Sequence, residues 1–392
     1  MNTSVRARGL LVALALASLL AAPSSIVSVS GDTGQATTSK QAPPKKNPLL
    51  KLAEAWPSAE VLKTRHAASD ALPLFASTDV LPITIAADFK AVTKDRQRNS
   101  TQRFPGELRT TRPDGQIDVL HVKLGTRGIF RLMPRNCDFP PLRVEFVKEE
   151  VKGTVFDGQS WLKLGTHCQD SGDYDQYVLK EYLTYKIFNL LTQKSFRARL
   201  LKATYVDSKS GKTVASRYGI FLEHDNDVAR RMEGRIIGIP RVVFADLDQD
   251  TLTLMMVFEY MIGNTDFSIY ANHNVRLVQT PDRKIYSLPY DFDISGLVHP
   301  PYAMPARGLT ITSVVDRLYR GPCRTPELIN PILANFLAKK DQIMALYDSL
   351  PDLKKEVRRE AKDYLDDFYS TIKSDKNAKR VFTDTCSKGA GM

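Results

Sequence analysis

The sequence is poor in cysteine and in long apolar runs, and each shortage excludes a class of site or protein. Its four cysteines are too far apart in the chain for a compact zinc site. Only one apolar run, Leu10–Ala22, approaches the length of a membrane span, and it is too short to cross a bilayer comfortably. The chain shows no internal repeat and no motif of an RNA- or DNA-binding fold. A zinc module, a set of membrane spans and a repeat architecture are therefore excluded.

The overall composition is that of a globular protein with a sizeable core. The chain has 392 residues, of which 43% are hydrophobic and 25% charged, and its formal net charge is +11. The Lys and Arg residues are spread along the chain, so we expect a solvated basic surface and no nucleic-acid partner. The same charge leaves open an attraction to anionic substrates or to an envelope surface.

The first 22 residues resemble a secretory signal. Arg6 and Arg8 precede the apolar run, and Leu20-Ala21-Ala22 offers small residues at a cleavage site. We expect residues 1–22 to be a signal peptide. The mature chain would then be exported, to the periplasm, the cell surface or the medium, without a transmembrane span. An uncleaved anchor is the alternative. No cysteine follows the run directly, which argues against a bacterial lipoprotein.

Export makes disulfides possible, because oxidising compartments preserve them. Four cysteines allow three pairings. The pairing of Cys137 with Cys168 and of Cys323 with Cys386 is favoured, because each pair joins cysteines of one region of the chain.

The remaining chain divides by pattern into a leader and two parts. Residues 23–78 are rich in Ser, Thr, Ala, Pro and Lys and predict a flexible leader with a short helix around Leu50–Trp56. Residues 79–224 show alternating strand patterns and one long helix, Tyr174–Gln193. Residues 225–392 are mostly helical in pattern and carry one hairpin. These signals predict an α+β fold of two lobes with a cleft between them, the first strand-rich and the second mostly helical.

Polar residues gather at both ends of the hairpin. Its expected strands are Val275–Gln279 and Lys284–Tyr290. The flanking polar residues are Asn264, Asp266, Asn272, His273 and Asn274 before the hairpin, and Asp291 and Asp293 after it. An antiparallel pair places its two outer ends side by side, so we expect these side chains to lie close together. Carboxylates with an amide suit a hard cation such as Mg²⁺ and the phosphates that it carries.

Two further features indicate phosphate binding. Lys163 lies in an expected strand and Glu181 in the next helix, 18 positions later (181 − 163). In kinases a strand lysine and a helix glutamate of this order form an ion pair. Gly125 and Gly128 flank Arg127 between two strands, where backbone N–H groups can approach a phosphate. Ordinary exposed positions explain the lysine and the glutamate equally well, and an ordinary turn explains the glycines.

The order of these segments resembles the CotH-type spore-coat kinase family, a divergent branch of the protein-kinase-like fold. The similarity covers roughly residues 120–296, and the motifs around Asp266 and Asp291 are its most specific part. The motifs are Arg127-Gly128 to Arg131 followed by Pro141–Phe146, Tyr182–Tyr185, Tyr218–Glu223, Asn264–Asp266 with His273-Asn274, and Tyr290–Asp293. The resemblance implies a two-lobed, protein-kinase-like fold.

The resemblance also implies roles at the hairpin. Asp266 would be the catalytic base that accepts the proton of the substrate hydroxyl. Asp291 would bind Mg²⁺ or Mn²⁺ together with Asn274, for which Asn272 is the competing candidate. Asp293 would assist.

Residues of the expected first lobe would bind the nucleotide. Lys163 with Glu181, or Arg127 and Arg143, would neutralise the phosphates of ATP. Glu223, in the strand motif, would lie at the nucleotide site. The resemblance thus implies an exported kinase that transfers a phosphoryl group from ATP to a hydroxyl on a protein or envelope acceptor.

Three other interpretations remain open at this stage. The fold can be retained without catalysis, as a pseudokinase that serves as an envelope-binding or assembly module. Two carboxylates in a cleft can be the acid and base of a hydrolase. The carboxylates can also simply cap helices and turns.

Overall fold

The computed structural model describes residues 49–387, whose contacts place them in one compact unit. The expected signal peptide, residues 1–22, and the first part of the expected leader lie outside these residues. The described part of the leader contains a short helix α1 (Leu50–Ala53), near the place expected, and a longer helix α2 (Ala59–Asp70) that was not predicted. Ser58 caps α2 with its side chain. These residues are therefore largely helical.

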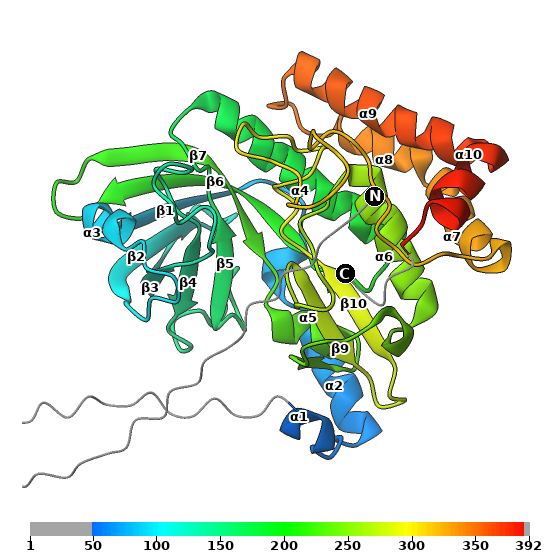
Figure 1. Cartoon of the computed structure of the whole chain (residues 1–392). Coiled ribbons are helices and arrows are strands. Elements are labelled where there is room, and N and C mark those ends of the chain that lie inside the picture. Colours follow the sequence, from blue (N-terminus) through cyan, green and yellow to red (C-terminus); the bar gives the residue numbers. More distant parts are fainter. Residues whose placement is uncertain (1–48, 388–392) are drawn as a thin grey trace, which may run out of the picture. The chain divides into compact units, whose positions relative to one another are not determined.

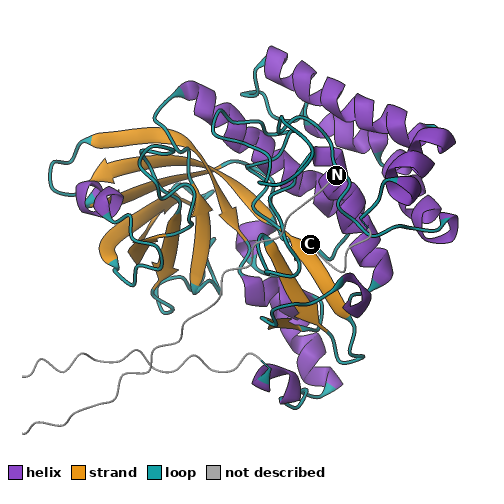
Figure 2. Ribbon diagram, in the orientation of Figure 1, coloured by secondary structure: helices purple, strands orange, loops and turns teal. Residues whose placement is uncertain are grey.

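Seven strands within the described residues close into a barrel, the larger group of orange arrows in Figure 2. Their order is β1-β2-β3-β4-β5-β7-β6, and all neighbours are antiparallel except β6 and β1. Exposed and buried residues alternate along most of β3, so one face of the strand lines the barrel core. The strands are β1 (Leu81–Ala87), β2 (Phe104–Thr111), β3 (Ile117–Thr126), β4 (Leu142–Phe146), β5 (Trp161–Gly165), β6 (Ala198–Asp207) and β7 (Thr213–Leu222).

The prediction of a two-lobed, protein-kinase-like fold is wrong, because the strands of the first half form this closed mixed barrel. Closure depends on the parallel pair β1 and β6, in which Leu81 lies opposite Leu201, 120 positions later (201 − 81). Alternation of apolar and polar residues predicts a strand and its buried face, but not the distant strand with which it pairs. The domain limits at residues 78 and 224 stay predictions.

The described residues contain two hydrophobic cores. One fills the barrel, with Ile85, Val144 and Phe221 fully buried. The other surrounds α4 and α6, which are buried over most of their length; α6 also packs against α7, α9 and β10. Figure 1 shows α4 running beside β6 and β7 of the barrel, which it contacts. The helices are α3 (Phe89–Lys94), α4 (Gly172–Leu191), α5 (Asp225–Arg231), α6 (Gln249–Ile262), α7 (Pro326–Ala338), α8 (Lys340–Leu346), α9 (Lys355–Lys373) and α10 (Asp375–Lys379), with short turns η1 (Pro73–Phe75), η2 (Phe244–Asp246) and η3 (Arg380–Asp384).

The predicted hairpin is confirmed and forms part of a small antiparallel sheet in the described range. The sheet has the order β10-β9-β8, with β8 (Arg235–Ile237), β9 (Val275–Gln279) and β10 (Ile285–Pro289). Pro289 lies opposite Val275. The two outer ends of the hairpin therefore meet, as the sequence predicted.

Both favoured disulfides are confirmed. Cys137 is bonded to Cys168, and Cys323 to Cys386. Two disulfides are consistent with an exported protein, because reducing compartments rarely keep them. Between residues 49 and 387, no helix combines the length and the apolar character that a membrane span needs.

Candidate functional site

The site is built on the outer ends of the β9–β10 hairpin. The Tyr290 amide donates a hydrogen bond to the Asn274 carbonyl oxygen at 3.0 Å, which places Asn274 beside the start of the segment Asp291–Asp293. Asn274 and Asp291 both have positive φ, at 51° and 68°. Asn and Asp tolerate this left-handed conformation better than other residues with a side chain. Two such residues at one place indicate a locally constrained backbone, which is frequent at functional sites.

Asp266 is held from several sides. The Asn274 side-chain amide donates to the Asp266 carbonyl oxygen at 2.7 Å and to its Oδ2 at 3.1 Å. The Nε2 atom of His273 lies 3.1 Å from Oδ1 of Asp266, and this hydrogen bond raises the pKa of His273 despite partial burial of the ring. The Asp266 amide donates to the side chain of Asn264 at 2.9 Å. These contacts fix the orientation of the Asp266 carboxylate.

A cavity of about 340 Å³ opens at these residues. One side is formed by the irregular segment between β3 and β4, residues 127–141, which we call the arginine loop. The residues that line the cavity are Arg127, Gly128, Ile129, Phe130, Arg131, Met133 and Pro141 from the arginine loop, and Asp266, His273, Asn274, Tyr290, Asp291, Asp293 and Ile294 from the hairpin side. Cations from the loop thus face carboxylates from the hairpin across one cavity.

The two arginines of this loop differ in their surroundings. Arg127 is half-buried, and its side chain forms no hydrogen bond or ion pair within residues 49–387. Arg131 is almost fully buried; it donates to the Thr166 carbonyl oxygen, and its Nη1 lies 3.9 Å from Oδ2 of Asp293. Burial lowers the pKa of Arg131, but Tyr302 and nearby carboxylates outweigh it and raise the pKa. Arg127 is therefore the cation that is available to a ligand.

Arg131 ends the motif that begins at Arg127-Gly128, but the resemblance assigns it no role. The short spacing between Arg127 and Arg131 could have indicated that Arg131 also belongs to the site. That spacing does not tell which of two arginines turns inwards, because an irregular loop has no fixed side-chain period. The structure adds Arg131 and Tyr302 to the site.

Three buried or half-buried carboxyl groups surround Arg131. Burial, with the charge of Asp291, raises the pKa of Asp293 to about 6. Burial and the charges of Asp293 and Asp291 raise the pKa of Glu181, on α4, well above its ordinary range. The Tyr302 hydroxyl donates to Oδ2 of Asp293 at 3.0 Å. Asp293 is thus engaged by the protein, whereas the Asp291 carboxylate forms no hydrogen bond within the described chain.

The expected ion pair of Lys163 with Glu181 does not form among the described residues. Lys163 instead binds Asp225, with 2.5 Å between its Nζ and Oδ1, and Arg276 binds the other oxygen of Asp225 at 2.7 Å. Its amine also lies 4.4 Å from the ring centroid of Tyr290. Burial lowers the pKa of Lys163 to about 8, and Asp225 opposes this shift. Lys163 therefore stands behind Tyr290, beside the cavity rather than in its lining.

Glu223 and Arg143 also stand outside the lining of this cavity in the described structure. Glu223 is fully buried and holds Arg231 through two contacts, at 2.7 Å to Oε1 and 2.8 Å to Oε2. The guanidinium of Arg143 binds Glu145 at 2.6 Å and lies 3.7 Å over the ring of Trp161. The lining of the cavity in the described chain thus brings together Arg127, Asp266, Asn274, Asp291 and Asp293, and it does not include Lys163, Glu181, Arg143 or Glu223.

The donor set fits a cation that arrives with a phosphate better than a permanent metal. No group of three or more His, Cys, Asp or Glu side chains within residues 49–387 is arranged to hold a metal ion. Mg²⁺ commonly takes only one or two protein carboxylates and completes its shell with phosphates and water. Asp291 offers a carboxylate free of hydrogen bonds in the described chain, and the Asn274 nitrogen is used by Asp266, which leaves its amide oxygen to a cation. Asn272 instead donates to the Ile239 carbonyl oxygen at 2.7 Å.

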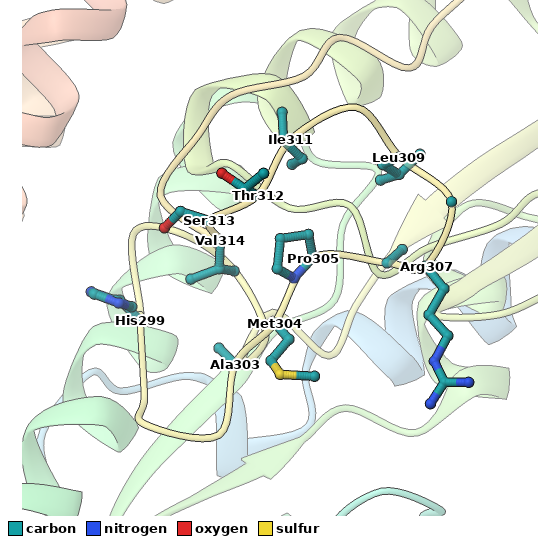
Figure 3. Close-up of a pocket in the computed structure, with 12 residues that line it drawn as sticks. His299, Ala303, Met304, Pro305, Arg307, Leu309, Ile311, Thr312, Ser313 and Val314 are labelled. Atoms are coloured by element: carbon teal, nitrogen blue, oxygen red, sulfur yellow. The ribbon is translucent and has the colours of Figure 1, made fainter.

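A second hollow, of about 430 Å³, lies in the loop 299–314 (Figure 3). It is lined mainly by apolar and hydroxyl residues, and Figure 3 shows His299 and Arg307 at its edges. Two hydrogen bonds join this loop to the residues at the first cavity. The Tyr302 hydroxyl donates to Asp293, and the Ala306 amide donates to the Thr265 hydroxyl at 3.3 Å. It has no facing sets of cations and carboxylates, so the chemistry is assigned to the cavity at the hairpin.

The free energy of unfolding is expected to depend on pH through His167, which lines a small cavity beside Arg131. Burial lowers the pKa of His167 to about 4 from its ordinary value of 6.5. The unfolded chain therefore binds the extra proton between these values, and stability falls as pH falls from 6.5 towards 4, by up to about 3 kcal/mol. A His167→Phe variant cannot titrate there, so urea unfolding of both proteins at pH 7 and pH 4.5 should show a smaller loss for the variant. Equal losses would contradict the assignment.

No protein-family model matches the chain, and no curated protein matches it. The resemblance to CotH-type kinases therefore rests on the motifs in the sequence.

Proposed function

We propose that this chain is an exported phosphotransferase of the CotH-like kind. It would transfer a phosphoryl group from ATP, bound with Mg²⁺ or Mn²⁺, to a hydroxyl on a protein or envelope acceptor. The observation that carries the proposal is one cavity in which Arg127, free of protein partners in the described chain, faces Asp266 and Asp291. Phosphoryl transfer requires mainly positioning and charge neutralisation, and these residue types supply both.

The proposed role of each residue follows from its contacts in the protein. Asp266 is held by Asn274 and His273, so its carboxylate is placed to accept the proton of an acceptor hydroxyl. As the hydroxyl oxygen bonds to the γ-phosphorus, the bond to the leaving diphosphate oxygen breaks. A bound divalent cation would neutralise charge on the phosphates, with Asp291 and the Asn274 amide oxygen as its protein ligands. Arg127 would neutralise charge from the other side of the cavity.

The proposed place of action is outside the cytoplasm. The signal-like first 22 residues support it, and the two disulfides agree with it. The partners would be a nucleotide and an acceptor that carries a hydroxyl group. The alternative is a chain that binds the nucleotide without transfer and serves as a binding module.

Thermal unfolding with ATP tests the nucleotide site. We expect ATP with Mn²⁺ or Mg²⁺ to stabilise the parent by about 2.7 kcal/mol at one hundred times its Kd, because the ligand binds only the folded state. Asp291→Asn should lose the metal-dependent part of this stabilisation, since an amide is a weaker ligand for a hard cation. Asn also tolerates the positive φ at position 291.

Asp282→Asn is the matched control. Asp282 lies at the exposed turn of the same hairpin, at the end away from the cavity. It should keep the full ATP effect. If saturating ATP leaves the unfolding temperature of the parent unchanged in the presence of Mg²⁺ and also in the presence of Mn²⁺, the nucleotide site is refuted. If ATP binds but no acceptor becomes labelled, the binding module is the better reading.

A further inference from the structure

The arginine loop has no helix or strand of its own, so its position depends on what it is attached to. It runs from residue 127 to 141, between β3 and β4, and supplies half of the lining of the cavity. Most of its internal hydrogen bonds are short-range, such as the Asn136 side-chain amide to the Phe130 carbonyl oxygen at 2.8 Å, and the Arg127 amide joins the two ends of the loop by donating to the Pro141 carbonyl oxygen at 3.0 Å. Such bonds shape a loop locally but do not fix it to the rest of the protein.

The covalent attachment of the loop is to one short segment, residues 166–168, which lies between β5 and α4; the Phe139 ring also packs in the barrel core, with its centroid 4.6 Å from that of the Tyr205 ring. Cys137 is joined to Cys168 by the disulfide, and the Phe139 amide donates to the Cys168 carbonyl oxygen at 2.9 Å. Arg131 donates to Thr166 in the same segment. The covalent bond thus lies only six positions (137 − 131) from the buried arginine of the site.

A second attachment comes from Arg96, after α3. Its guanidinium donates to the Cys137 carbonyl oxygen at 3.0 Å and to the Asp138 carbonyl oxygen. A third bond, to the Leu132 carbonyl oxygen at 3.4 Å, lies beside Arg131, so Arg96 in the described structure binds the backbone at both Leu132 and Cys137 but does not bond to Arg127. Apart from the backbone of the described chain itself, the disulfide is the one covalent bond between the loop and the segment that joins β5 to α4.

We propose that formation of the Cys137–Cys168 disulfide completes the anion site, so that the oxidised chain binds the nucleotide more tightly than the reduced chain. This inference rests on the proposed function for the identity of the ligand. The physical reason is that a loop freed from residue 168 spends part of its time with Arg127 and Arg131 out of place. The apparent Kd then rises by the inverse of the competent fraction.

The redox step is an exchange with a dithiol or its disulfide. In reduction, a dithiol gives two electrons and two protons; the bond between the two sulfurs breaks, Cys137 and Cys168 become thiols, and the dithiol becomes a cyclic disulfide. Oxidation on export is the reverse exchange, with a disulfide as the oxidant. Both cysteines are buried in the folded chain, at 0% and 1% exposure. The bond is therefore set while the chain folds, and it then persists.

Two pairs of substitutions test this inference. Cys137→Ser with Cys168→Ser removes the bond at the loop, and Cys323→Ser with Cys386→Ser removes the other disulfide as a matched control. Hydrogen exchange of amides 127–139 is measured without ligand, and the Kd for ATP with Mn²⁺ is measured by titration. We expect faster exchange of these amides and about tenfold weaker ATP binding in the first variant only.

The two measurements separate the possible failures. Unchanged exchange of amides 127–139, or an unchanged Kd, in the first variant overturns the role of the disulfide. Faster exchange with no ATP binding even in the parent refutes the proposed function but keeps the attachment of the loop. If the first variant does not fold, as judged by lost protection in β6 and β7, Cys137→Ala with Cys168→Ala is used instead, because alanine adds no buried hydroxyl group at these positions. The same two measurements then decide.

Discussion

Replacing Arg231 by methionine is expected to lower the free energy of unfolding by about 3–5 kcal/mol, because the change leaves a buried carboxylate without its counter-charge. Glu223 and Arg231 are exposed by only 1% and 5% of their side chains, and two contacts join them. Arg231 also donates to the Ser195 carbonyl oxygen at 2.7 Å. Urea unfolding at neutral pH measures the loss.

The neighbouring Arg230 provides the matched control. It sits on the same helix, α5, and forms an ion pair with Asp227 at 2.8 Å, but about half of its side chain is exposed. Arg230→Met should cost less than Arg231→Met, because solvent already screens the half-exposed Arg230, although its partner Asp227 is buried. The double change Glu223→Met with Arg231→Met should recover part of the loss, because no charge remains buried. An Arg231→Met cost no larger than that of Arg230→Met would contradict the interpretation.

The same ion pair explains what the motif around Glu223 does in this structure. Its position at the end of the strand motif Tyr218–Glu223 led us to expect Glu223 at the nucleotide. In the structure the Arg197 amide also donates to Glu223, at 2.9 Å, so every oxygen of the carboxylate is engaged by the protein. A carboxylate with these partners serves the packing of α5 against the barrel.

Local patterns predicted the hairpin and the long helix well. Alternation and a tight turn define β9 and β10, and antiparallel geometry then brings Asn274 to Asp291 without any further assumption. The long helix was expected over Tyr174–Gln193 and spans Gly172–Leu191. The hairpin and the long helix are each encoded within a short stretch, where residue spacing decides the geometry.

Long-range partners could not be predicted from spacing. Lys163 was matched to Glu181 by its order in the chain, but it binds Asp225, 62 positions away. The same reason applies to the parallel pairing of β1 with β6 and to the burial of Arg131 between α4 and the hairpin. Both contacts form only when segments that are far apart in the sequence come together in the fold. Residues that the hairpin joins therefore lie together as predicted, whereas the partner of Lys163, which lies in a distant segment, differs from the prediction.

Replacing Asp266 by asparagine is expected to have the largest effect on the proposed phosphoryl transfer. An amide cannot accept the proton of the acceptor hydroxyl, so the turnover rate should fall by about 10²–10⁴-fold. The amide keeps the size of the side chain and can still bond to Asn274 and His273, so ATP affinity should change little.

Turnover and affinity measured on the same preparations distinguish a lost base from a lost binding site. Labelling of an acceptor gives the rate, and ATP titration with Mn²⁺ gives the Kd. Asp282→Asn, at the far end of the hairpin, should match the parent in both. Full transfer by Asp266→Asn would exclude Asp266 as the base. A fall in transfer matched by an equal loss of ATP binding would instead assign Asp266 to the ligand site, where its contacts with Asn274 and His273 organise the hairpin end of the cavity.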